Sequence, residues 1–299
     1  MGVTHSPPVA GVDRGLALLK AARPVEWSKN LFVLAPVVFS GEFDSVASLG
    51  SALVTFAAFC AAASAGYVVN DLVDADLDRR HALKRHRPIA SGALGRLDAA
   101  IAATALAVAA LALGLVVSVS VAGVLVAYGA LTVLYSVLLK RAVILDVMTI
   151  GALFLVRVLA GALAVEVTVS EWLLVCTGAL ALFLGFAKRR QEAAAELRAG
   201  TGARPVLEHY SLPFLDQMVA MVTAVTVISY VIYTLDSPLV GDQMLATVPP
   251  VLYGVFRYLY LIYDRGDERG TAELITRDPG MLVAGVVWVG VAGVLIYAN

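Results

Sequence analysis

Apolar segments long enough to cross a lipid bilayer follow one another along almost the whole chain. A membrane-spanning helix needs about 17–25 largely apolar residues. Nine segments come close to this length, at 27–43, 46–69, 99–117, 119–139, 142–165, 172–187, 214–235, 244–263 and 281–298. Hydrophobic residues make up 60% of the chain and charged residues 15%, whereas a water-soluble domain usually carries about a quarter charged residues. The sequence therefore predicts an all-α integral membrane protein with nine transmembrane helices.

Lys and Arg gather in alternate loops. With nine spans, the first 30 residues and the loops after spans two, four, six and eight lie on one side, and they hold 20 of the 22 Lys and Arg residues. The other two, Arg157 and Arg257, lie inside spans, and the opposite loops have none. Because Lys and Arg accumulate on the cytoplasmic side, we expect a multi-pass plasma-membrane protein with a cytoplasmic N-terminus and an external C-terminus.

The domain organisation follows from the same pattern. Residues 1–13 are polar and are expected to form a disordered cytoplasmic N-terminus, and residues 14–299 a single membrane domain. Long loops often carry function, so the long cytoplasmic loops 70–96 and 188–213 are expected to cap an active site that faces the cytoplasm. The net charge of −1 gives no basic field for binding nucleic acid. Assembly into a homo-oligomer is left open.

Four aspartates follow the second apolar segment. If the helix continues, Asp71, Asp74 and Asp78 fall within about 60° of one another, whereas Asp76 points about 140° away from Asp71. Carboxylates on one stripe repel each other, and Mg²⁺ is typically held by a few carboxylates together with phosphate oxygens. The spacing predicts a Mg²⁺ site, with Mn²⁺ as the alternative ion. The competing interpretation is a solvated helix end whose acids pair with nearby cations, Arg79, Arg80 and Lys84.

A basic loop follows the aspartates. Its cations, Lys84, Arg85 and Arg87, are followed by Pro88 and Gly92, which favours an ordered turn able to close over anionic oxygens. We expect the three cations to contact the phosphates of a substrate. The general excess of positive charge in cytoplasmic loops explains part of the same pattern.

The pattern Asn70-Asp71-x-x-Asp74-x-x-x-Asp78, followed by Arg-Pro-Ile-Ala-Ser-Gly at 87–92, resembles the first motif of the UbiA superfamily of intramembrane prenyltransferases. The resemblance implies a fold of nine helices around a central cavity closed by cytoplasmic cap loops. It also implies that the three aspartates are catalytic and coordinate Mg²⁺ bound to a diphosphate, with Asn70 beside them as a contact to the donor phosphates.

The chain departs from members that prenylate aromatic rings, which carry a second aspartate-rich motif after the sixth span. Here the corresponding stretch begins Lys188-Arg189-Arg190-Gln191-Glu192. Clustered cations suit direct contact with phosphate, so we expect these three to bind donor phosphates, with Glu192 a further candidate metal ligand. The alternative is a run of ordinary charges at the end of a span, with Lys188 and Glu192 paired one turn apart.

Residues 23–30, Arg-Pro-Val-Glu-Trp-Ser-Lys-Asn, resemble the start of one UbiA branch, the decaprenyl-phosphate phosphoribosyltransferases. The resemblance implies transfer of 5-phosphoribose from 5-phosphoribosyl 1-diphosphate to a polyprenyl phosphate such as decaprenyl phosphate, which supplies the arabinose donor of mycobacterial-type cell walls. An interfacial anchor, with Trp27 among the lipid headgroups and Lys29 reaching them, explains part of the segment but leaves Asn30 unexplained.

This branch suggests a division of the polar residues between two substrates. The donor diphosphate, with its metal ion, would lie on the aspartates, and its 5-phosphate on the cations at 188–190. The lipid acceptor carries a monophosphate and needs cations, for which the candidates are Arg23, Lys29, Asn30, Tyr135 and Lys140. Tyr135 and Lys140 resemble a Tyr/Lys pair that the family usually spaces by three residues, and four residues separate them here.

Charged residues within spans are costly and usually face an interior cavity. Arg257 lies about 10 Å from the cytoplasmic end of its span by helix rise, so we expect it to contact donor phosphates. Arg157 is expected either to line the cavity or to pair with a carboxylate between helices, and Asp146 lies one turn into its span.

The resulting hypothesis is a Mg²⁺-assisted glycosyl transfer in which the lipid phosphate attacks C1 of ribose and inverts it. One alternative is a UbiA-type enzyme that joins a polyprenyl diphosphate to an aromatic acceptor, which would need a second acidic motif. Another is a membrane lipid transporter, for which an inverted repeat would be typical, and the sequence shows no evident repeat.

Overall fold

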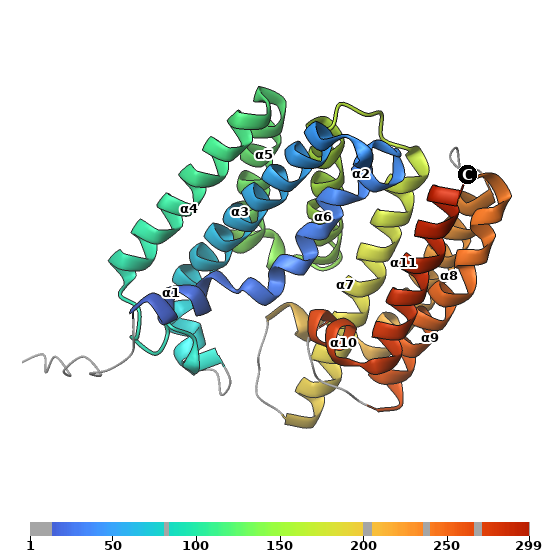
Figure 1. Cartoon of the computed structure of the whole chain (residues 1–299). Coiled ribbons are helices and arrows are strands. Elements are labelled where there is room, and N and C mark those ends of the chain that lie inside the picture. Colours follow the sequence, from blue (N-terminus) through green and yellow to red (C-terminus); the bar gives the residue numbers. More distant parts are fainter. Residues whose placement is uncertain (1–13, 81–83, 200–204, 236–239, 266–270, 299) are drawn as a thin grey trace, which may run out of the picture.

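The computed structural model describes residues 14–80, 84–199, 205–235, 240–265 and 271–298, and each regular element in these ranges is a helix (Figure 1). The prediction for residues 1–13 lies outside the described residues. The α-helices are α1 (Arg14–Ala22), α2 (Ala35–Phe39), α3 (Val46–Arg80), α4 (Arg96–Val117), α5 (Val119–Val137), α6 (Leu145–Ala164), α7 (Glu171–Ala199), α8 (Leu212–Leu235), α9 (Val248–Tyr263), α10 (Thr271–Arg277) and α11 (Pro279–Ala298). The 3₁₀ helices are η1 (Pro24–Leu34), η2 (Glu42–Asp44), η3 (Lys84–His86), η4 (Leu139–Arg141), η5 (Pro205–His209) and η6 (Gly241–Thr247).

Eight helical stretches in the described ranges are long and apolar enough to cross a membrane: α3, α4, α5, α6, α7, α8, η6 with α9, and α11. They correspond to the last eight predicted segments and confirm an all-α membrane protein. Parts of the two predicted cap loops are helical, since α3 continues through the aspartates to Arg80 and α7 continues past the basic residues to Ala199.

The first predicted span, 27–43, is not a continuous membrane helix, so the count of nine helical spans is not confirmed. Its residues form η1, then α2, then the start of η2. Pro36 has no N–H, and its ring obstructs the helical carbonyl four residues earlier. Lys29 and Asn30 add polar groups that favour contacts with other helices over exposure to lipid.

This irregular segment runs alongside α3 in the opposite direction. Near its start, Trp27 Nε1 donates to Ser64 Oγ at 3.0 Å, and near its end Val37 packs in one cluster with Ala52. The segment therefore follows α3 from the end that carries the aspartates towards the end where α3 begins.

A glycine lets η1 enter the bundle. A Cβ atom on Gly161 of α6 would lie 2.0 Å from the carbonyl oxygen of Val33, so a larger residue could not be accommodated without moving η1. Val33 is fully buried in a cluster with Phe59 and Tyr128. Irregular backbone at membrane depth is tolerated where protein surrounds it, and η1 meets this condition at Asn30 and Val33, its two buried residues.

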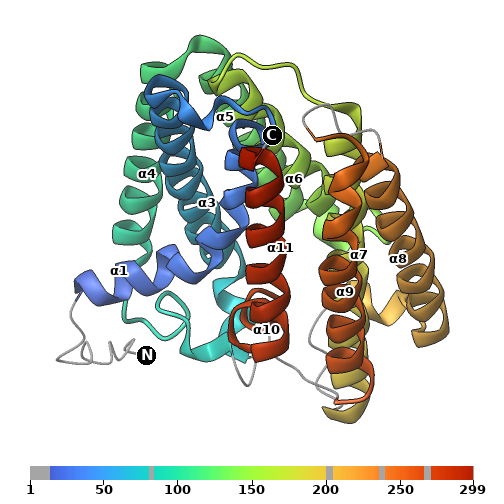
Figure 2. The same ribbon diagram turned by 45° about the vertical axis from the view of Figure 1, so that its right-hand side comes forward.

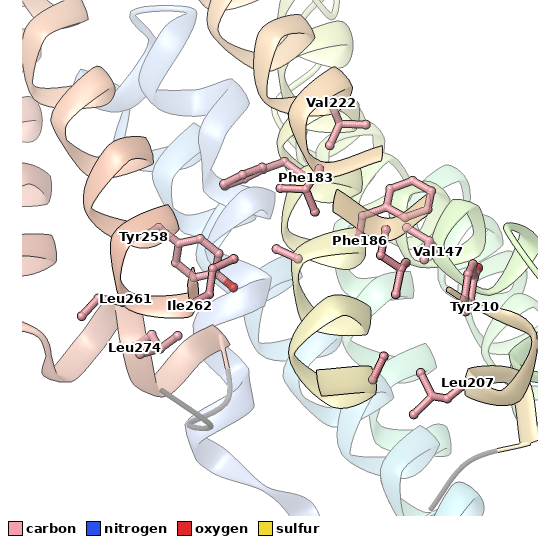
Figure 3. Close-up of a cluster of buried hydrophobic side chains, with 14 of the residues drawn as sticks. Val147, Phe183, Phe186, Leu207, Tyr210, Val222, Tyr258, Leu261, Ile262 and Leu274 are labelled. Atoms are coloured by element: carbon pink, nitrogen blue, oxygen red, sulfur yellow. The ribbon is translucent and has the colours of Figure 1, made fainter. Parts of the chain in front are cut away.

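The second half of the chain has its own apolar core, which joins α6, α7, η5, α8, α9 and α10 (Figure 3). The rings of Phe183 and Tyr258 meet edge to face with centroids 5.5 Å apart, and Leu274 of α10 is completely buried beneath them. Figures 1 and 2 show α1, α10, the end of α3 and the end of α7 at the same end of the bundle.

Candidate active site

Three of the four aspartates at the end of α3 form one stripe. Asp71 and Asp78 are 2% and 4% exposed, and the side chain of Asp74 is 18% exposed. Asp76 points elsewhere, with its side chain 69% exposed and paired with Arg96 at 3.0 Å. The helical spacing thus has the expected consequence, and Asp71, Asp74 and Asp78 are called the acidic stripe from here on.

Two arginines lie against the most buried members of the acidic stripe. Arg87 Nη1 donates to Asp71 Oδ1 at 3.1 Å and to Asp78 Oδ2 at 2.7 Å. Arg23 Nη2 donates to the same Asp71 oxygen at 2.6 Å. One nitrogen atom of Arg87 therefore links two carboxylates that lie two helical turns apart.

The third member of the stripe has a cation of its own. Lys140 Nζ, from η4 between α5 and α6, donates to the two oxygens of Asp74 at 2.6 and 2.8 Å. Asp76 pairs with Arg79 of its own helix, as a solvated helix end would. The members of the stripe instead pair with cations from other elements, which the structure brings to one place.

Local structure positions Arg23 and Arg87 differently. Arg23 links α1 to η1 with a left-handed backbone (φ 52°), and its guanidinium lies over the ring of Tyr67. Arg87 belongs to a loop that Ile89 and Leu94, both 2% exposed, anchor in a cluster with α1 and α4. The backbone of Arg87 is therefore fixed, whereas its side chain remains 25% exposed.

One basic residue of α7, Arg189, belongs to a second network. Arg189, 1% exposed, donates through Nε to Asp146 Oδ2 at 2.5 Å and through Nη1 to Glu192 Oε2 at 2.5 Å. It also reaches the Tyr135 hydroxyl at 3.3 Å. Tyr210 donates to the other oxygen of Asp146 at 2.7 Å, and burial beside this carboxylate raises the pKa of Tyr210. The network joins α5, α6 and α7 to the segment before α8.

Arg190 and Arg257, which were also predicted to contact phosphate, are paired with carboxylates. Arg190 Nε donates to Asp216 at 3.0 Å. Arg257 forks onto Asp278 at 3.0 and 2.9 Å, and Asp278 also accepts the N–H of Met281 in the first turn of α11. The hydrogen bonds from Arg257 lower the pKa of Asp278 to about 2.

Asn30 belongs to a buried cluster deeper in the bundle. Its side-chain oxygen accepts Arg157 Nε at 2.8 Å, and its amide donates to Cys60 Sγ at 3.4 Å. Arg157 also donates to the Tyr128 hydroxyl and to the Leu153 carbonyl. Asn30 is completely buried and Arg157 is 4% exposed, so this cluster joins η1 to α3, α5 and α6.

The remaining predicted residues lie on four elements: Asn70 on α3, Lys84 and Arg85 on η3, Lys188 on α7, and Lys29 on η1. Lys29 pairs with Glu26. The partners of Asp146 could not be identified from the sequence, although a lone carboxylate one turn into a span is a signal of a buried pair. Nothing in the sequence singles out Tyr210 or Asp278, because both lie at helix boundaries, where polar residues are ordinary.

The acidic stripe offers the ligands that Mg²⁺ prefers, carboxylate oxygens. Asp71 and Asp78 are close enough to share one nitrogen of Arg87, so they are also close enough for a shared ion to be considered. Across the described ranges, no three acidic, His or Cys side chains are gathered where they could hold a metal ion. Each carboxylate of the stripe is paired with a cation in this structure. By its chemistry, carboxylate oxygens on one side of a helix end, the donor set suits a divalent ion.

The fold matches solved membrane proteins of one class. A UbiA homologue from Archaeoglobus fulgidus bound to GPP and Mg²⁺ matches with a TM-score of 0.72 over 94% of this chain and 99% of the homologue, at 18% identity. A digeranylgeranylglyceryl phosphate synthase structure matches with a TM-score of 0.66 over 96% of this chain and 100% of that chain, at 16% identity. The protein therefore has the fold of the UbiA class.

Residues 31–277 match the UbiA prenyltransferase family, and the chain belongs to this family. The decaprenyl-phosphate phosphoribosyltransferase of Mycolicibacterium smegmatis is 32% identical over 99% of both chains. The protein of the same name from Mycobacterium tuberculosis is 30% identical over 98% of both chains. That from Corynebacterium glutamicum is 30% identical over 91% of this chain and 84% of the relative.

Proposed function

We propose that the protein transfers 5-phosphoribose from 5-phosphoribosyl 1-diphosphate to a polyprenyl phosphate such as decaprenyl phosphate, releasing diphosphate. The observation that carries this proposal is the acidic stripe paired with Arg23, Arg87 and Lys140. Carboxylates suit a divalent ion that arrives with a diphosphate, and cations suit the phosphates of both substrates. The names of relatives that match over nearly the full length support the same two substrates.

In this proposal Asp71, Asp74 and Asp78 hold Mg²⁺, or Mn²⁺ in its place, with Glu192 as a further candidate ligand. When bound, the ion neutralises negative charge on the departing diphosphate. Solved UbiA homologues with Mg²⁺ or Cd²⁺ support a divalent ion in this class.

The cations around the stripe divide between donor and acceptor. Arg87 lies on the donor side, together with Asn70, Lys84 and Arg85. The candidates for the 5-phosphate are Lys188, Arg189, Arg190 and Arg257, and each of the three arginines would have to release a carboxylate. The candidates for the lipid phosphate are Arg23, Lys29, Tyr135 and Lys140. Asn30, the fifth candidate, is buried and would position η1, which carries Lys29.

The chemistry requires no general base. The lipid phosphate, anionic at neutral pH, attacks C1 of ribose on the face opposite the diphosphate. The new C1–O bond forms as the bond to diphosphate breaks, and the bonding electrons leave with the diphosphate. C1 gains oxocarbenium character, as in glycoside hydrolysis, and in-line attack on an α-configured donor gives a β-linked product.

The site is proposed to face the cytoplasm of a plasma-membrane protein with a cytoplasmic N-terminus and an external C-terminus. The support is the placement of 20 of the 22 Lys and Arg residues on one side of the predicted spans, because loops on the cytoplasmic side of a membrane carry an excess of these residues. The product would serve the synthesis of cell-wall arabinan.

The test incubates the purified full-length protein with Mg²⁺, labelled 5-phosphoribosyl 1-diphosphate and decaprenyl phosphate, and measures label that becomes extractable into organic solvent. We expect time-dependent transfer. A preparation that leaves this label in water but joins a prenyl diphosphate to an aromatic acid would establish the aromatic prenyltransferase alternative instead. Movement of polyprenyl phosphate across reconstituted vesicles without any transfer would establish a transporter.

A further inference from the structure

We infer that Arg87 makes the binding of the divalent ion and the binding of diphosphate mutually dependent. This inference rests on the proposed function but concerns only the binding of the two ligands, before any transfer of ribose. It follows from what the Arg87 side chain touches, from the charge of its surroundings and from how the residue is held.

A single atom of Arg87 lies between the two most buried carboxylates of the acidic stripe. Its Nη1 is 3.1 Å from Asp71 Oδ1 and 2.7 Å from Asp78 Oδ2. These carboxylates are 2% and 4% exposed, so water contributes little to neutralising them. In this arrangement, Arg87 and a metal ion compete for the same pair of oxygens.

The charges around Arg87 balance without a ligand. Asp71 and Asp78 are offset by Arg23 and Arg87, and Asp74 is offset by Lys140. A divalent ion that arrived alone would have to displace a cation, and a diphosphate that arrived alone would meet the carboxylates. Separating a partly buried pair without new partners is strongly unfavourable, so each ligand alone should bind weakly.

Arg87 is built to exchange partners without moving the fold. Its loop is held by backbone hydrogen bonds from Ser91 N to Arg87 O and from Leu94 N to Pro88 O, both 2.9 Å long. The long side chain is still 25% exposed, and a guanidinium binds phosphate oxygens as readily as carboxylates. A diphosphate therefore gives Arg87 a new partner and at the same time releases two carboxylates.

The consequence is reciprocal coupling. If diphosphate draws Arg87 away and thereby strengthens metal binding, the metal must strengthen diphosphate binding by the same factor. The metal and the diphosphate would then enter as a pair, and the carboxylates would not retain a metal ion after the diphosphate has left.

The test measures the binding of radiolabelled inorganic diphosphate to the purified full chain, with and without saturating Mg²⁺, and of Mn²⁺ alone from the spectrum of the free ion. In the wild type we expect Mg²⁺ to raise the affinity for diphosphate by about tenfold or more, and Mn²⁺ alone to bind weakly. In Arg87→Gln we expect Mn²⁺ alone to bind about tenfold tighter and the effect of Mg²⁺ on diphosphate to shrink. Arg87→Lys, which keeps one charge, should restore weak Mn²⁺ binding.

The matched control is Arg96→Gln, which removes an arginine paired with Asp76, the aspartate outside the stripe, and should leave both affinities at wild-type values. Equal Mn²⁺ affinity in the wild type and in a folded Arg87→Gln protein would overturn the inference, as would diphosphate affinity that is independent of Mg²⁺. These measurements need no phosphoribosyl transfer. Coupled binding without transfer would refute the proposed function alone, and transfer with independent binding would refute this inference alone.

Discussion

Two helix ends carry most of the charges in the candidate site, and they are built in opposite ways. At the end of α3 the carboxylates belong to one helix, while their cationic partners come from other elements and, for Arg23 and Arg87, are 26% and 25% exposed. At the end of α7 the cations belong to the helix, and the pair between Arg189 and Asp146 is almost completely buried, at 2% and 0%.

This difference in exposure suggests that the end of α3 binds substrate and that the end of α7 stabilises the fold. The arginines paired with the acidic stripe are about a quarter exposed although the carboxylates that they contact are buried, so a phosphate ligand can reach these arginines and offer them a new partner. A buried pair is costly to break, because the remaining charge has no solvent to stabilise it. We therefore expect substrate to exchange the pairs at the end of α3 far more readily than the buried Arg189 pair, which makes Arg189 the least favoured of the candidates for the 5-phosphate.

The largest effect should come from the acidic stripe. Asp71→Ala or Asp74→Ala removes a proposed metal ligand and should lower the rate of phosphoribosyl transfer on the order of a hundredfold or more. The measurement is solvent-extractable label at saturating Mg²⁺. Asp76→Ala, on the same helix but outside the stripe, should be mild. Normal rates in the two stripe variants would show that the stripe is not the centre of the reaction.

Arg189→Gln tests the buried ion pair at the end of α7. It leaves Asp146 buried with Tyr210 as its donor, and we expect a loss of about 3–5 kcal/mol in the free energy of unfolding, measured in detergent or bicelles. Arg190→Gln is the matched variant, because its partner Asp216 is 43% exposed, and its cost should stay within about 1 kcal/mol. A stable Arg189→Gln protein with a raised KM for the donor would instead make Arg189 a phosphate contact.

Asn30→Ala tests how the buried charge of Arg157, which has neutral hydrogen-bond partners, is stabilised. Without the amide, Arg157 Nε loses its acceptor inside the bundle, which should cost about 1–3 kcal/mol of unfolding free energy. Asn30→Asp restores an acceptor and should recover much of the loss. Unchanged stability with weaker binding of the lipid phosphate would assign Asn30 to the acceptor site.

Arg257→Gln tests whether Arg257 contacts a phosphate of the donor or only stabilises the fold through its ion pair with Asp278. Because the guanidinium holds Asp278 between α10 and α11, we expect a lower unfolding temperature and a KM for the donor that changes less than about threefold. Asp278→Asn should lower the unfolding temperature similarly. If Arg257→Gln raises KM strongly while Asp278→Asn does not, Arg257 binds the donor directly.

The smallest effect concerns pH. The pKa of Asp278 is lowered from 3.8 to about 2 by the hydrogen bonds from Arg257, so its stabilising contribution is complete above the ordinary pKa and is lost as pH falls towards the lowered one. The gap in unfolding temperature between the wild type and Asp278→Asn should stay constant from pH 7 to about pH 4 and narrow below that. A gap that narrows already near pH 6 would contradict this pairing.

Several features were accessible from the sequence because they depend on local pattern. Apolar segments predicted eight of the membrane helices, and helical spacing separated Asp76 from the acidic stripe. The failure at 27–43 also has a local cause, Pro36 and the polar pair at 29–30, but the sequence could not show that α6 would offer Gly161 as a place for irregular backbone.

Partner choice among the charges was beyond the sequence. Lys188, Arg189 and Arg190 are identical in kind to phosphate-binding cations, and nothing in their spacing indicates that Asp146, 43 residues away from Arg189, occupies one of them. A guanidinium binds carboxylate and phosphate through the same geometry. Only the three-dimensional neighbourhood distinguishes a structural pair from an open site.

That this is a helical membrane protein with three carboxylates on one side of a helix follows from contiguous residues, because apolar length and helical period are local properties. Which cations pair with those carboxylates depends on how the helices pack, since Arg23 lies 48 residues from Asp71 and Lys140 lies 66 residues from Asp74. Electrostatic pairing acts through space and is sharpened by burial, so it is fixed only once the helices have packed.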